Sequence, residues 1–182
     1  MSEPLPSSDS DLDAAKALFW AHDGSSFYMS RGLMRDELER FRRFAVPPEV
    51  QAQWLSELTA EQLVKLGEPG NAMVVNFLLH HGDTAYLNEL VAQAPLGTVR
   101  ERCAYLEDLL RYIDRCAGRE FFVPRHPLTH YHFDDIRRAL EVVRQRTQQS
   151  FPRPVSAANA HRVRRIAEAA ERRLVVHRAS GV

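Results

Sequence analysis

Residues 98–117, TVRERCAYLEDLLRYIDRCA, constrain the fold of this chain more than any other stretch. Apolar residues recur along it at spacings of three and four, which places them on one side of an α-helix: Val99, Cys103, Leu106, Leu110, Ile113 and Ala117. A second stripe beside the first consists of Tyr105, Leu109, Tyr112 and Cys116. A face this wide exceeds what a single neighbour covers, so we expect this helix to pack against several others.

Local signals predict where several helices begin and end. Thr98 and Glu101 have the spacing of a capping box, and Gly118 stands where a left-handed C-terminal cap is expected. Thr59 and Gln62 have the same capping-box spacing and predict a separate short helix that ends at residue 66. In the apolar run 72–81 a nearly enclosed helix is expected, followed by Gly82 as its end and Asp83 as the cap of the next helix.

Helical periodicity continues through most of the chain, and no repeat of the common helical arrays is present. The sequence therefore predicts an all-α protein, an irregular multi-helix bundle of about eight or nine helices with a basic C-terminal helix. We expect a disordered tail over 1–10, a helical body over 11–150, and a linker with the basic helix over 151–182. Asp134 or Asp135 is expected to cap the helix that runs to residue 149.

Both cysteines, Cys103 and Cys116, lie on the apolar side of the 98–117 helix. About 20 Å of helix separates them, too far for a disulfide, so they are interpreted as reduced core residues. The sequence has neither a signal-like N-terminus nor an apolar run long enough for a membrane span. A cytoplasmic protein without a membrane partner is therefore expected.

Residues 119–133, REFFVPRHPLTHYHF, contain two prolines and three histidines and show no helical period. They predict an extended loop, longer than most connections and therefore a candidate functional loop. Imidazole and carboxylate groups are ligands of zinc and iron, so a divalent metal site is one hypothesis, with the ligands His126, His130, His132 and Asp134. The alternative is that Asp134 caps a helix while the histidines stack on aromatic residues of the loop.

Two other histidine motifs are interpreted as structural. An adjacent His-Asp pair such as His22-Asp23 is typical of HD-type metal phosphohydrolases, but those enzymes carry another histidine ligand upstream, and no histidine precedes His22. A helix end followed by a turn explains the pair better. His80 and His81 likewise stand at the predicted end of a helix, where imidazoles interact favourably with its carbonyl groups.

Charge is distributed unevenly along a chain whose formal net charge is zero. Residues 1–135 hold 13 Lys or Arg and 21 Asp or Glu, whereas residues 136–182 hold 11 Arg and three Glu. We expect the basic end to dock on the acidic body. The alternative is that Arg162, Arg165, Arg172 and Arg173 bind nucleic acid or another partner. Ion pairs between these arginines and the acidic body would disfavour such binding. A thin apolar stripe on the last helix, Val163, Ile166, Ala170 and Leu174, could dock on the body or on a second copy.

No glycine-rich phosphate loop, nucleophile elbow or polar cysteine beside a histidine is present, so the catalytic residues stay unassigned. The leading hypothesis is a non-catalytic binding or scaffold protein of the bacterial cytosol, with a groove near the 119–133 loop. Its partner would be another protein or the chain itself. The first alternative is a metal-dependent hydrolase or oxygenase that uses the histidine-rich loop with zinc or iron. The second is nucleic-acid binding through the arginine-rich C-terminal helices.

Overall fold

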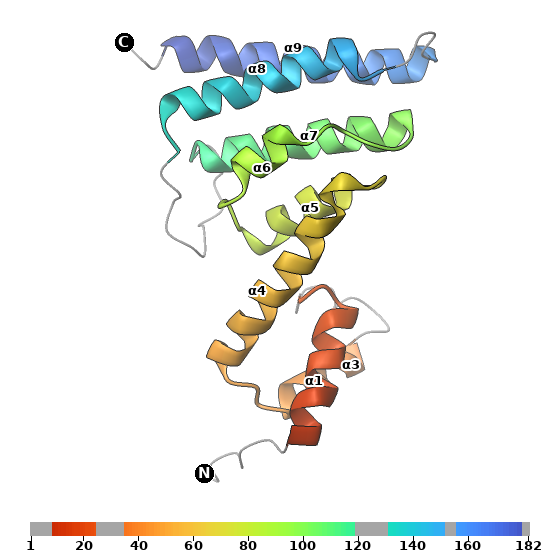
Figure 1. Cartoon of the computed structure of the whole chain (residues 1–182), viewed down its shortest axis with the longest axis vertical. Helices are drawn as coiled ribbons and strands as arrows, with labels where there is room; N and C mark the ends of the chain where they lie inside the picture. Colours follow the sequence, from red (N-terminus) through yellow and green to blue (C-terminus); the bar gives the residue numbers. More distant parts are fainter. Residues whose placement is uncertain (1–8, 25–34, 119–130, 152–155, 180–182) are drawn as a thin grey trace. The chain divides into compact units, whose positions relative to one another are not determined.

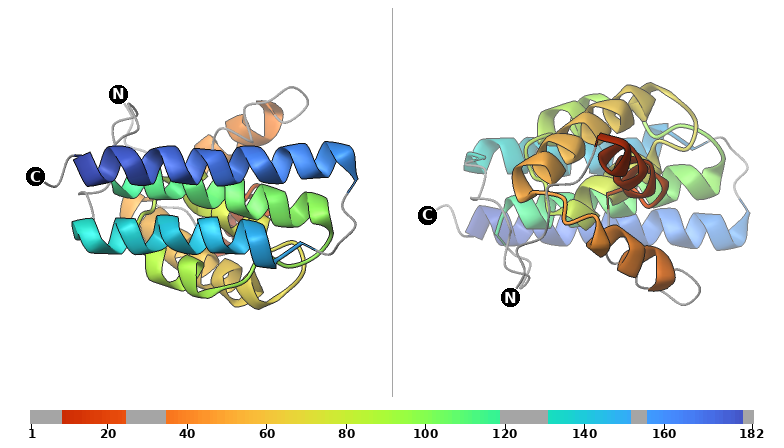
Figure 2. Two further views of the ribbon diagram at one scale, coloured as in Figure 1. Left: turned by 90° about the horizontal axis from the view of Figure 1, so that it is seen from above. Right: turned by 90° about the horizontal axis from the view of Figure 1, so that it is seen from below.

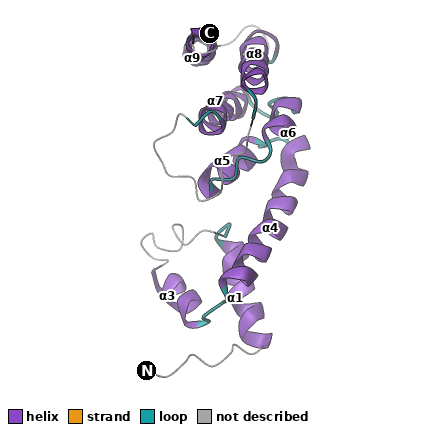
Figure 3. Ribbon diagram, turned by 90° about the vertical axis from the view of Figure 1, so that its left-hand side faces the viewer, coloured by secondary structure: helices purple, strands orange, loops and turns teal. Residues whose placement is uncertain are grey.

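A computed structural model describes residues 9–24, 35–118, 131–151 and 156–179 of the chain. Within these residues the structure consists of eight α-helices and one 3₁₀-helix, without a strand (Figure 1, Figure 3). The predicted all-α multi-helix fold is therefore confirmed. Among the described helices, none is both long enough and apolar enough to cross a membrane. The chain divides into two compact units, Met1–Val64 and Lys65–Val182.

The first unit has an aromatic core. Its helices are α1 (Asp9–Ala21), α3 (Arg35–Arg43) and α4 (Pro48–Val64). The ring of Phe19 lies 6.0 Å from that of Phe41 and 5.8 Å from that of Trp54, measured between ring centroids. All three rings are buried, so each of the three helices contributes an aromatic side chain to one core.

The predicted break before residue 59 is wrong. Pro48–Val64 is one continuous helix, and a short 3₁₀-helix, Lys65–Gly67, follows it. Thr59 is buried in the middle of α4 and does not cap a helix. An N-cap residue needs a non-helical backbone, and the preceding residues, Leu55 to Leu58, contain no proline or glycine that would interrupt the helix.

The second unit is organised around α7, as the width of its apolar face predicts. This unit contains α5 (Ala72–His81), α6 (Leu87–Ala92), α7 (Val99–Cys116), α8 (Phe133–Gln149) and α9 (Ala157–Ala179). Within it α7 packs against all four other helices, and Figure 1 shows α8 and α9 side by side on one side of α7. Tyr105, Leu106, Leu109 and Tyr112 have no exposed surface. Both ends of α7 match the prediction: Thr98 and Glu101 form the capping box, and Gly118 has a left-handed backbone.

The basic helix α9 docks within the second unit. It packs against α8 and α7, and Ile166, Ala170 and Leu174 are buried there. These three residues are therefore covered by the chain itself and cannot dock on a second copy. Residues 1–8 of the predicted tail and 152–155 of the predicted linker lie outside the described residues.

Candidate functional site

The predicted metal site can be followed only in part. His126 and His130 lie outside the described residues. His132 is exposed immediately before α8, and the exposed carboxylate of Asp134 pairs with Arg137 at 3.1 Å. Within the described part of the chain, no three His, Cys, Asp or Glu residues are grouped so that they could hold a metal ion. The zinc or iron hypothesis therefore stays a prediction about this loop.

The expected cap of α8 is wrong by two to three residues. The helix begins at Phe133, so His132 occupies the N-cap position that was expected for Asp134 or Asp135. Asp135 instead accepts a hydrogen bond from the backbone N–H of His132 at 3.2 Å, which is the reaching-back half of a capping box. Acidic residues are favourable in the first turn of a helix as well as at the N-cap position. For this reason Asp134 and Asp135 were assigned to the N-cap, although they lie in the first turn.

The His-Asp pair has a structural role. His22 directly follows α1, is buried, and its Nε2 lies 2.6 Å from a carboxylate oxygen of Glu37. Asp23 has a positive φ of 49°, and Gly24 has one of 67°. These values belong to a helix end followed by a turn, as predicted.

Candidate nucleophiles in the second unit are buried and protonated. Cys103 and Cys116 are free thiols enclosed in the core. Burial raises the pKa of the Cys116 thiol to about 12 and also raises that of Cys103. The pKa values of Tyr105 and Tyr112 are likewise raised by burial. Because the thiolate and phenolate forms react as nucleophiles, none of these four groups is activated at neutral pH.

Two tyrosine hydroxyls support the start of α6. The Tyr112 hydroxyl accepts a hydrogen bond from the backbone N–H of Tyr86 at 3.0 Å. The Tyr131 hydroxyl accepts one from Leu87 N–H at 3.0 Å and donates one to Ala85 O at 2.7 Å. First-turn N–H groups of a helix need external acceptors, and here tyrosines from α7 and from the residues before α8 supply them. Tyr131 therefore fixes the end of the 119–133 segment next to α8.

The four arginines predicted to bind a partner separate into two pairs. Arg162 donates two hydrogen bonds to Glu107, and Arg173 contacts both carboxylate oxygens of Asp114. Both ion pairs join α9 to α7, so the predicted docking of the basic end on acidic residues occurs at these two points. Arg165 and Arg172 are exposed on the other side of α9. They are the members of the set that a partner could reach.

Three further arginines bond to carbonyl groups at or near helix ends. Arg115 donates to Leu79 O in the last turn of α5, and Arg146 donates to Val91 O in the last turn of α6 at 2.6 Å. Arg102 donates to Ser150 O, just after α8, at 2.6 Å. The final carbonyl groups of a helix lack partners within it and carry partial negative charge. These three arginines therefore connect helices of the second unit.

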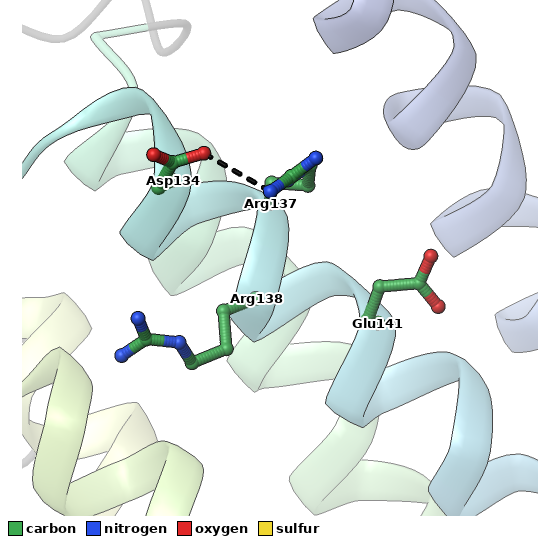
Figure 4. Close-up of a pocket in the computed structure, with 4 residues that line it drawn as sticks. All are labelled: Asp134, Arg137, Arg138 and Glu141. Carbon is green, nitrogen blue, oxygen red and sulfur yellow. Dashed lines mark ion pairs between the residues drawn. The ribbon is translucent and has the colours of Figure 1, made fainter.

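A surface hollow of about 400 Å³ lies on the first half of α8 (Figure 4). Four charged side chains line it: Asp134, Arg137, Arg138 and Glu141. In Figure 4, Arg138 and Glu141 point to opposite sides of α8, and Glu141 lies on the side of α9. The hollow contains two positive and two negative groups, which favours neither a purely anionic nor a purely cationic ligand.

Exposed apolar residues occur at the same end of the helix pair. Phe133, at the start of α8, is 39% exposed, and Val175 and Val176, in the last turns of α9, are 56% and 55% exposed. Figures 1 and 2 show that the start of α8 and the end of α9 lie at the same end of the α8–α9 pair. The two helices run antiparallel, and Arg144 of α8 pairs with Glu171 of α9 at 3.9 Å, so Val175 lies about level with Leu140 of α8. We call the hollow and these three apolar residues the end surface.

Sequence reasoning missed Val175 and Val176. The predicted apolar stripe included Leu174 but not the two valines that follow it. Three consecutive apolar residues on a helix span about 200° of its circumference, so at least one of them faces away from the core. The run of three apolar residues, 174–176, therefore indicated in the sequence that an apolar side chain is exposed here.

Comparison with protein families, with curated proteins and with solved structures returns no match to this chain.

Proposed function

We propose that this chain is a non-catalytic binding protein that engages a partner protein at the end surface. The observation that carries the proposal is the exposure of Phe133, Val175 and Val176 at the end of the α8–α9 pair where the charged hollow of α8 also lies. Grouped apolar side chains surrounded by polar residues are typical of protein–protein contact surfaces. Phe133 is also the last residue of the stretch 119–133, for which the sequence predicts a candidate functional loop.

A binding role is supported over catalysis by the use of the reactive side chains. The cysteines and two of the tyrosines are buried with raised pKa values. His22 is paired with Glu37 in the first unit. Among the described residues, no nucleophile lies beside a base in an open pocket, as nucleophilic catalysis would require.

The charges of α9 support a protein partner over nucleic acid. Arg162 and Arg173 are already neutralised by acids of α7. Glu168 and Glu171 stand between Arg165 and Arg172 on the exposed part of α9. Carboxylates at these positions would repel a phosphate backbone, whereas a protein can offer both signs of charge.

Site-specific photo-crosslinking tests the proposal. A photoreactive phenylalanine analogue is placed at Val175 or, as the matched control, at Ala158, which is exposed at the opposite end of α9. In the cells that make the protein, we expect discrete protein adducts at position 175 that are missing at position 158. Adding Val176→Asp should abolish them. Identical patterns at both positions, or adducts insensitive to Val176→Asp, would overturn the proposed surface.

A further inference from the structure

We propose that a second copy of the chain binds the outer face of α9, which shares Val175 with the end surface, with the two α9 helices antiparallel and Glu168 of each copy paired with Arg172 of the other. The inference rests on the proposed function, because it names the partner that contacts Val175 of the end surface. Charge complementarity along α9 carries it.

One row of side chains runs along the outer face of α9. It consists of His161, Arg165, Glu168, Arg172 and Val175, all of them exposed. Their spacings of four, three, four and three keep the row on the side of the helix opposite the buried residues Ile166, Ala170 and Leu174. The row is therefore the part of α9 that an approaching helix would meet first.

The charges in the middle of this row have no ionic partner among the described residues. Arg162, Glu171 and Arg173 on the flanks are engaged with α7 or α8. Glu168 and Arg172 have the i, i+4 spacing of an intrahelical ion pair, yet they form no ion pair in the described structure. Both charges are therefore available to a second molecule.

In a two-fold symmetric dimer, Glu168 and Arg172 of one copy are complementary in charge to Arg172 and Glu168 of the other. A two-fold axis at the level of Ala170 brings Glu168 of one copy level with Arg172 of the other, twice, because each lies two residues from the centre. Val175 then comes level with the aliphatic stem of Arg165 of the other copy, five residues from the centre. A parallel arrangement would place Glu168 against Glu168 and Arg172 against Arg172, so only the antiparallel pairing is attractive.

Sedimentation velocity of the full chain over a concentration series, at low ionic strength, measures this association directly. We expect concentration-dependent dimerisation that weakens with added salt. Glu168→Arg and Arg172→Glu each place like charges opposite one another across the dimer. Each should therefore lower the association constant by about tenfold or more. The double variant restores opposite charges and should recover the native association constant to within about threefold. Glu89→Arg, the same charge change at an exposed position on α6, should leave it unaltered.

A native chain that stays monomeric at the highest soluble concentration would overturn the dimer, as would a double variant that associates no better than the singles. The photo-crosslinks at position 175 separate this failure from that of the proposed function. A monomeric chain that still forms those adducts with a different protein refutes the second copy alone. A monomeric chain without adducts refutes both proposals.

Discussion

At the scale of single residues, Asn71 joins two loops of the second unit. Its Nδ2 donates to Leu66 O at 3.0 Å and to Ala94 O at 2.9 Å, and its Oδ1 accepts from Leu96 N at 3.4 Å. The side chain is 1% exposed, so water cannot replace these bonds if they are lost. This polar contact organises the loops at the beginning of α5 and before α7.

Asn71→Asp is therefore expected to destabilise the protein by about 2–4 kcal/mol at neutral pH, because it removes two donors and places a negative charge beside two carbonyl oxygens. Asn71→Ala, which leaves three backbone groups without a partner, serves as the reference. Urea unfolding measures both, and the aspartate variant should regain stability at acidic pH, where its protonated carboxyl can donate again. An aspartate variant as stable as the native chain would contradict this role.

Two acids of α7 have pKa values shifted in opposite directions. Burial raises the pKa of Asp108, and the contacts with Arg111 and Asn76 do not offset this effect. Hydrogen bonds from the backbone N–H and the hydroxyl of Thr98 lower the pKa of Glu101. Asp108 therefore stabilises the fold below its unfolded-state pKa and loses that contribution as pH rises, whereas Glu101 contributes above its unfolded-state pKa and loses it as pH falls.

Asp108→Asn should consequently raise the free energy of unfolding at neutral pH and have little effect in acid, below about pH 4. Glu101→Gln, on the same helix, should lower stability at neutral pH and change little in acid. Chemical denaturation at both pH values measures the two variants side by side. Equal signs for the two variants at neutral pH would show that the assigned environments are wrong.

At the scale of elements, α7 could be predicted from local pattern, whereas the start of α6 could not. The stripes, the capping box and Gly118 of α7 all lie within its own segment. The predicted cap Asp83 instead bonds to Ala85 N–H at 3.0 Å, and α6 begins four residues later, at Leu87. Its first N–H groups depend on Tyr112 and Tyr131, 26 and 44 residues away. Partners so distant in sequence leave no local signal.

The candidate site also depends on partners that are distant in the sequence. The sequence identified the arginines of α9 but could not assign them, because Glu107 and Asp114, which engage Arg162 and Arg173, belong to a helix more than 50 residues earlier. The exposure of Val175 also depends on how α9 is turned against α7 and α8. Such information arises only when the helices pack.

Tyr112→Phe and Tyr131→Phe test the capping of α6. Each should destabilise the protein by about 1–3 kcal/mol, because Tyr112→Phe leaves one backbone group without its partner and Tyr131→Phe leaves two. Amide hydrogen exchange should separate them: Tyr112→Phe accelerates exchange at Tyr86, and Tyr131→Phe accelerates it at Leu87. If each variant affected both amides equally, the hydroxyls would not act individually as acceptors.

The docking of α9 predicts a contrast between adjacent residues. Leu174 is fully buried and Val175 is 56% exposed. Leu174→Ala should cost about 2–5 kcal/mol through lost burial and the cavity it leaves. Val175→Ala should change stability by no more than about 0.5 kcal/mol. Similar losses for the two variants in thermal or chemical unfolding would show that α9 is turned differently.

At the scale of the whole molecule, the second unit has a core of its own. Its four other α-helices pack around α7, and the ion pairs and carbonyl bonds of its arginines connect residues within it. A fragment of residues 65–182 should therefore remain helical and unfold cooperatively. Circular dichroism during urea titration tests this expectation. A fragment that unfolds without a cooperative transition would contradict the division into two units.

The central claim is that the protein acts by binding a partner at the end surface. The most direct measurement is quantitative co-purification from the cells that make it, comparing the native chain with Val175→Asp and Ala158→Asp. Both changes place the same charge on an exposed position of α9, at its opposite ends. We predict that Val175→Asp loses the partner with little change in thermal stability, while Ala158→Asp retains it. Retention by both variants, or equal loss from both, would contradict the claim.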